Sequence, residues 1–214
     1  FSDSGSFNSE YIYYYFQYLP FIFIAILISC LCPALLTINK KEIRSRTNCS
    51  PVSTTKQTFQ ITLGAIIYAV IIWLIFMIAA LILCGKMLLC REGLLAVLNS
   101  LVFMLVVLSM TLLISVLAPS PKATDMIANT IGLGMSFLCG VFVPQKFLGE
   151  AVINVAHFLP AYWFIRANNM LAGISDELFS SSKYFSYLGI ELLFAVAIFS
   201  VVLLVAKTKI RSSS

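Results

Sequence analysis

The chain has 214 residues, of which 60% are hydrophobic and 11% are charged, and its formal net charge at pH 7 is +5. Soluble globular domains are about 45–50% apolar and about 25% charged, so this composition excludes an ordinary soluble domain. The apolar residues form long continuous blocks, and about 20 of them in a helix cross a hydrocarbon core of about 30 Å. Because continuous blocks favour helices over barrel strands, we predict an all-α integral membrane protein.

About five blocks are predicted to be membrane-spanning helices. In chain order they cover residues 19–38, 61–84, 94–118, 126–143 and 187–206. The first contains Pro33, which lacks a backbone donor and clashes with the preceding turn, so we expect a kink there. Residues 1–18 are expected to be the end of an extracellular segment, and 207–214 a cytoplasmic tail. Because the polar start is no signal peptide, we interpret the chain as part of a longer protein whose first span precedes it.

Residues 147–171 form a further apolar block that is too interrupted to span. Its charged, polar and helix-breaking positions are Glu150, His157, Pro160 and Arg166. The longest unbroken piece is shorter than a span requires, so we predict a re-entrant or interfacial block. Pro144 and Pro160 mark its breaks, and Tyr162 suits a membrane interface.

The basic residues predict an orientation in the plasma membrane. With five spans, nine of them fall on one side: Lys40, Lys41, Arg44, Arg46, Lys56, Lys122, Lys207, Lys209 and Arg211. The other side has Lys86, Arg91, Lys146, Arg166 and Lys183. Because short cytoplasmic loops are enriched in Lys and Arg, we expect the start of the chain outside and its C-terminus in the cytoplasm.

The connection between the first two spans, residues 39–56, is the most informative polar segment. It is basic and predicted to be cytoplasmic, and Ser53 is suited to cap a helix that enters the second span. One interpretation is an anchor that only fixes orientation. The other is a docking element for a cytoplasmic partner.

The fourth predicted span has a face of small residues at every fourth position. These are Ala128, Gly132, Ser136 and Gly140, and such spacing lets two helix backbones approach closely in lipid. The partner helix can belong to the same chain or to a second copy, and both alternatives stay open. Asn99 in the third span is expected to bond between helices or to line a path.

Glu191 is the one acidic residue placed well inside a predicted span. An intramembrane carboxylate is costly and marks a functional candidate. Glu191 is also near the outer end of its span, from which a glutamate can reach the interface, so a structural role stays open beside the functional one. The sequence has no P-loop, HExxH or Gly-x-Ser-x-Gly motif, and we expect no catalysis, no cofactor or metal bound by this chain, and no nucleic-acid partner.

Two groups of residues resemble a known family over nearly the whole chain. The first is residues 42–46 and 49–53 before the second span, and the second is residues 134–144 followed by 158–162. Together with the order of spans and the re-entrant block, they are similar to the ABC-2 type permeases, the membrane subunits of bacterial ABC exporters and their relatives.

The resemblance implies export of an unidentified substrate by two paired permease subunits, identical or different, each with a separate ATP-binding subunit. Glu42, Arg44, Arg46, Ser50 and Ser53 would couple to the ATPase. Asn99, Gly132, Ser136 and Gly140 would form the path or the dimer face, and Pro144, Pro160, Tyr162 and Glu191 would belong to the re-entrant region. The alternatives are an ATP-independent secondary transporter, a membrane anchor or assembly protein, and an intramembrane enzyme.

Overall fold

The computed structural model describes residues 4–38, 54–174 and 180–211, and within them the side chains of residues 12–38, 59–174 and 180–205. Every regular element in these ranges is helical. The elements are α1 (Ser4–Ile26), η1 (Leu27–Leu31), α2 (Cys32–Ile38), α4 (Thr54–Cys84), η2 (Gly85–Leu89), α5 (Arg91–Leu117), α6 (Pro121–Cys139), η3 (Gln145–Phe147), α7 (Glu150–Ala156), α8 (Pro160–Leu171) and α9 (Ser181–Arg211).

Four helices of the described part are long and apolar enough to cross a membrane. They cover Ile12–Ile38, Phe59–Leu89, Arg91–Leu117 and Ser181–Val205. The prediction of an all-α membrane protein is therefore confirmed. Helix α1 already begins at Ser4, before the predicted span at residue 19, and where the membrane crossing starts along it stays a prediction.

The remaining predicted span, residues 126–143, corresponds to α6, which begins earlier and ends earlier than expected. Pro121 occupies its first turn, and the Ser120 hydroxyl accepts a hydrogen bond from the backbone N–H of Ala123, as a helix cap does. The helix ends at Gly140, whose φ of 100° is left-handed. With 19 residues, α6 is about 28 Å long, and its crossing of the membrane stays a prediction.

The first span contains a wide turn where a kink was expected. Residues Leu27–Leu31 form a π-helix between α1 and α2, and Pro33 follows in the first turn of α2. Proline clashes with the carbonyl four residues before it, here that of Ser29, which lies inside the π-helical turn. The irregularity therefore begins one turn before the proline.

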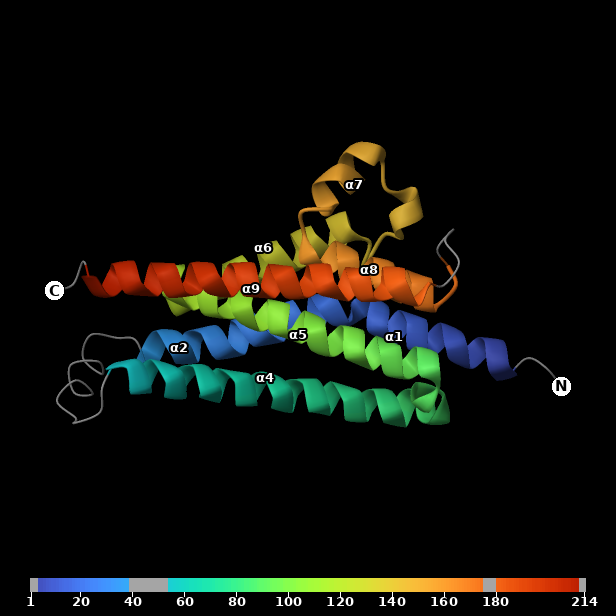
Figure 1. Ribbon diagram of the computed structural model, residues 1–214, viewed down its shortest axis with the longest axis horizontal. Helices are drawn as coiled ribbons and strands as arrows, with labels where there is room; N and C mark the ends of the chain where they lie inside the picture. Colours follow the sequence, from blue (N-terminus) through green and yellow to red (C-terminus); the bar gives the residue numbers. More distant parts are fainter. Residues whose placement is uncertain (1–3, 39–53, 175–179, 212–214) are drawn as a thin grey trace.

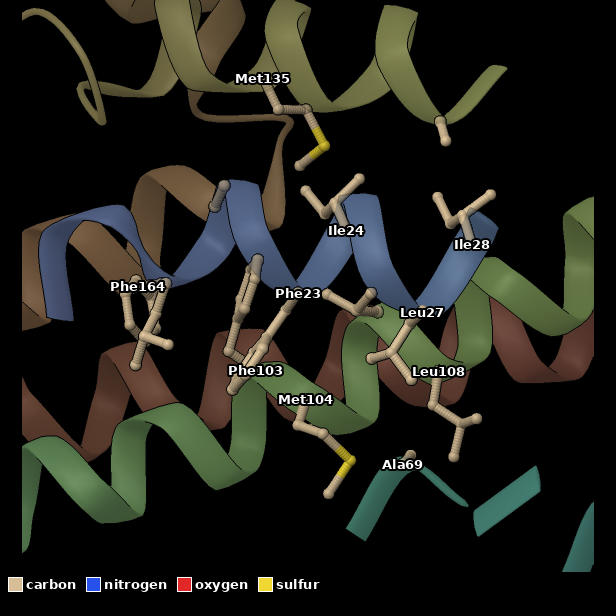
Figure 2. Packing of buried hydrophobic residues seen from close by; sticks show 14 of the residues in the cluster. Phe23, Ile24, Leu27, Ile28, Ala69, Phe103, Met104, Leu108, Met135 and Phe164 are labelled. Carbon is tan, nitrogen blue, oxygen red and sulfur yellow. The ribbon is translucent and has the colours of Figure 1, made fainter. Parts of the chain in front are cut away.

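Helix α5 lies at the centre of the bundle and packs against α1, α2, α4, α8 and α9 (Figure 1). Figure 2 shows α1 between α6 and α5, with Ile24 facing Met135 of α6 and Phe23 and Leu27 facing α5. Phe103 of α5 packs against Phe164 of α8, with ring centroids 4.9 Å apart. This core holds the elements that carry the candidate site.

Helices α4 and α9 cover opposite sides of this core and expose long apolar faces (Figure 1). Only 17% of the apolar window of α4 and 22% of that of α9 is buried inside the chain. In a bilayer such side chains meet lipid tails, whereas in water they would be a large exposed apolar surface.

The ends of the long helices lie at two opposite ends of the bundle. The end of α2, the starts of α4 and α6, and the end of α9 lie at one end, whereas the start of α1 and the η2 turn lie at the other (Figure 1). The segments that carry the nine grouped basic residues adjoin the first of these ends. Their position on the cytoplasmic side stays a prediction.

Candidate functional site

The small-residue face of α6 packs against α1 of the same chain. Ala128 and Ser136 are almost completely buried, and a Cβ atom at Gly132 would lie 3.5 Å from the Ile24 Cγ2 atom and 3.6 Å from the Phe21 ring. Small residues thus let α1 approach α6 closely. This arrangement favours internal packing over a dimer face for Gly132 and Ser136.

The end of α6 is held by a buried side chain of the first span. Gln17 is 4% exposed, and its Nε2 donates to the backbone carbonyl of Gly140 at 2.5 Å and to that of Val141 at 3.4 Å. These carbonyls lie where the left-handed Gly140 turns the chain out of the helix, and a buried carbonyl requires a donor. Gln17 was not predicted as a site residue, although an amide between apolar residues was a signal in the sequence.

A second amide ties this turn to the block that follows. The Gln145 Nε2 donates to the carbonyls of Cys139, at 2.9 Å, and Tyr162, at 3.2 Å. Asn169 Nδ2 donates to Gln145 Oε1 at 3.4 Å, and the Tyr13 hydroxyl donates to Asn169 Oδ1 at 3.0 Å.

These hydrogen bonds form one set, which we call the polar junction: Tyr13, Gln17, Gln145, Asn168 and Asn169. Asn168 contributes through its Nδ2, which donates to the Tyr13 carbonyl at 3.4 Å. The polar junction links α1 to the end of α6, to η3 and to α8. A displacement of α1 therefore acts directly on these three elements.

The block predicted to be re-entrant consists of two short helices, α7 and α8, neither of which is long enough to span. Pro160 is the first residue of α8, and Pro144 directly precedes η3. Both prolines therefore lie at the starts of helical elements. The placement of this block within the membrane stays a prediction.

Aromatic residues hold Arg166 between α8 and α9. Its Nη1 donates to the Tyr162 hydroxyl at 2.7 Å, and its guanidinium lies 5.9 Å from the Tyr162 ring centroid and 5.7 Å from that of Tyr187. Burial alone lowers the pKa of Arg166, but interactions with these two tyrosines raise the pKa above its ordinary value, and the group stays charged. Tyr162 is only 3% exposed, so it packs inside the chain, and its position relative to the membrane interface stays a prediction.

Asn99 and Glu191 are fully buried, on α5 and α9 respectively. Asn99 Nδ2 donates to the Phe164 carbonyl of α8 at 3.1 Å, which is the bond between helices that was one of its two expected roles. The Glu191 carboxyl group lies inside the helix packing with 0% exposure, so it does not extend from the surface of the bundle toward the interface. Sequence position gave its depth along the helix but not the face on which it lies.

The five expected coupling residues, Glu42, Arg44, Arg46, Ser50 and Ser53, lie outside the described residues. In the described ranges, no three His, Cys, Asp or Glu side chains are grouped to hold a metal ion.

The described residues form an apolar bundle that carries the polar junction toward one of its ends. The profile of the ABC-2 family transporter proteins matches residues 2–206. The chain belongs to the ABC-2 transporter family. Neither the curated proteins nor the solved structures contain a match to it. As a family member, the chain is a membrane transport subunit.

Proposed function

We propose that this ABC-2 family chain is the permease subunit of an ATP-driven exporter, in which a separate ATP-binding subunit docks on residues 39–56 and a second permease subunit completes the path. The observation that supports the proposal is the position of α1. One end of the span that α1 begins adjoins the basic connection, and its other end carries Tyr13 and Gln17 of the polar junction (Figure 1).

This span acts as a lever between the two ends. It covers Ile12–Ile38, which is 27 residues and about 40 Å at 1.5 Å per residue. A force applied by the ATP-binding subunit near residue 39 is transmitted along it to the carbonyls that Gln17 holds. Closure of the ATPases would thereby move the end of α6 together with α8, and release the substrate on the outer side.

The π-helical turn at Leu27–Leu31 divides the lever. Single π-helical turns inside α-helices occur often at functional sites, and this one packs against both α5 and α6. Bending there would tilt the half near residue 39 relative to the half with Tyr13 and Gln17. The turn therefore sets how much of the applied motion reaches the polar junction.

A proton-coupled secondary transporter is the second candidate. Glu191 favours it, because such transporters use buried carboxyl groups inside the membrane. It requires no ATP-binding subunit, so the two candidates differ in what co-purifies with the protein.

The test is a pull-down of the full-length protein in mild detergent, followed by an assay of ATP hydrolysis. Wild type is compared with Arg44→Glu/Arg46→Glu and with a matched charge reversal in the tail, Lys207→Glu/Lys209→Glu. We expect wild type and the tail variant to retain an ATP-binding subunit that the Arg44/Arg46 variant loses. Folded wild-type protein that retains no ATPase would overturn the proposal and favour the secondary transporter or a membrane anchor.

A further inference from the structure

Glu191 is a carboxyl group buried deep in the helix bundle without a hydrogen-bond partner. It lies ten residues after the start of α9, about 15 Å along the helix. Its exposure is 0%, and within the described part of the chain neither Oε1 nor Oε2 has a hydrogen-bond partner. In native proteins, fewer than about one buried polar group in ten lacks a hydrogen-bond partner, and each such group requires an explanation.

The surroundings of Glu191 come from α5 and α8, which both pack against α9. Hydrophobic side chains buried where these three helices meet include Val102, Ala167, Met170 and Leu188. The buried amides of Asn99 and Asn168 donate to backbone carbonyls and not to Glu191, so the described residues offer no compensation for a negative charge.

The titratable groups on these three helices do not neutralise Glu191. Tyr184 interacts electrostatically with it, but the Tyr184 hydroxyl donates to the Leu95 carbonyl at 2.6 Å. Tyr187 and Tyr162 hold Arg166. Helix α5 has its described charges, Arg91 and Glu92, only in its first turn.

An unpaired carboxylate in such a setting is far less stable than the neutral acid. Moving an isolated ion into a medium of low dielectric constant is strongly unfavourable by Born solvation, so the group takes up a proton instead. A neutral acid leaves only the smaller cost of an unsatisfied polar group. Burial between α5 and α9 thus requires the protonated form.

We propose that Glu191 is a proton-binding site that is occupied whenever α9 packs against α5 as it does here, and that loses its proton only when the two helices separate. Because the packed state holds the proton more tightly than the separated state, lowering the pH favours packing and raising the pH favours separation. Helix packing in this transport subunit is thereby linked to pH. The site exists whether transport is driven by ATP or by protons.

Infrared spectroscopy of the protein in lipid nanodiscs near neutral pH tests the site directly. We expect the difference spectrum between wild type and Glu191→Gln to contain the carbonyl stretch of a protonated carboxylic acid. The matched control is Glu92→Gln, which removes an exposed glutamate and should remove only carboxylate bands. Carboxylate bands in the Glu191 difference spectrum would overturn the proposal.

One further measurement keeps the proposal testable if Glu191→Gln folds poorly, and another tests the link between pH and helix packing. Wild-type protein labelled with 13C-glutamate should itself show a protonated acid band that shifts with the label, and its absence would refute the site. The dependence of thermal stability on pH tests the link between proton binding and helix packing. Wild type and Glu92→Gln should lose stability at alkaline pH, whereas the stability of Glu191→Gln should be unaffected. Equal losses in all three proteins would contradict a pH-dependent packing of α9.

Discussion

Replacing Gly140 by alanine should destabilise the protein more than the same substitution at the other glycines of α6. Gly140 has a φ of 100°, which residues with a side chain rarely adopt. A Cβ atom there would also lie 2.5 Å from the Gln145 Cγ atom and 3.4 Å from its backbone nitrogen. Gln145 must therefore move away from the end of α6.

The expected cost follows from these two effects. A left-handed conformation costs about 1–2 kcal/mol for a residue with a Cβ atom. Displacing Gln145 also breaks its hydrogen bonds to the carbonyls of Cys139 and Tyr162, at about 0.5–1.5 kcal/mol each. We expect Gly140→Ala to lower the free energy of unfolding by about 2–5 kcal/mol in total.

The assay is reversible unfolding in mixed micelles, followed through the fluorescence of the two tryptophans, Trp73 on α4 and Trp163 on α8. The matched control is Gly134→Ala in the same helix, where a Cβ atom would have nothing within 4 Å. There, the higher helix propensity of alanine predicts an unchanged or higher stability, by up to about 1 kcal/mol. Equal stabilities for the two variants would refute the role assigned to the turn.

Three other substitutions test the packing, the first two in the same assay and the third through the yield of folded protein. Gln17→Leu leaves carbonyls at the end of α6 without a donor and should cost about 1–3 kcal/mol, whereas Gln60→Leu on an exposed position should cost nothing. Tyr184→Phe removes the hydrogen bond to the Leu95 carbonyl and should cost about 0.5–1.5 kcal/mol; an unchanged midpoint would contradict that bond. A Cβ atom at Gly93 would overlap the backbone of the η2 turn, which cannot move aside as a side chain can. The yield of folded Gly93→Ala should therefore fall sharply. A yield equal to that of wild type would contradict this close contact between Gly93 and the turn.

The spans were predictable because the bilayer sets their length and composition. The order of the spans followed from the positions of the long apolar blocks. The short helices after α6 followed from a block that is too interrupted to span. Helix α1 runs through Tyr13 and its tyrosine neighbours before it reaches the apolar block, and the polar hydroxyls of these residues gave no signal of a span there. The π-helical turn was missed because the position of Pro33 indicates an irregular turn but not its form.

The polar junction could not be predicted from local patterns. The Gln17 amide and the Gly140 carbonyl are separated by 123 positions in the chain, and only the packing of α1 against α6 brings them together. The same holds for Tyr13 and Asn169, which are 156 positions apart. For Glu191, the sequence predicted the depth along the span. Its burial was not predictable, because it depends on how α9 is rotated about its own axis in the bundle.

The most direct test of the account places a photo-crosslinking residue at position 44, in the connection between α2 and α4, and a second one at position 86, in η2 at the opposite end of the bundle (Figure 1). Illumination of membranes that contain the full-length protein should then yield an adduct with an ATP-binding subunit from position 44 and none from position 86. An ATPase adduct from position 86 alone, or from neither position while the protein remains folded, would contradict the claim that this end of the bundle receives the force of ATP hydrolysis.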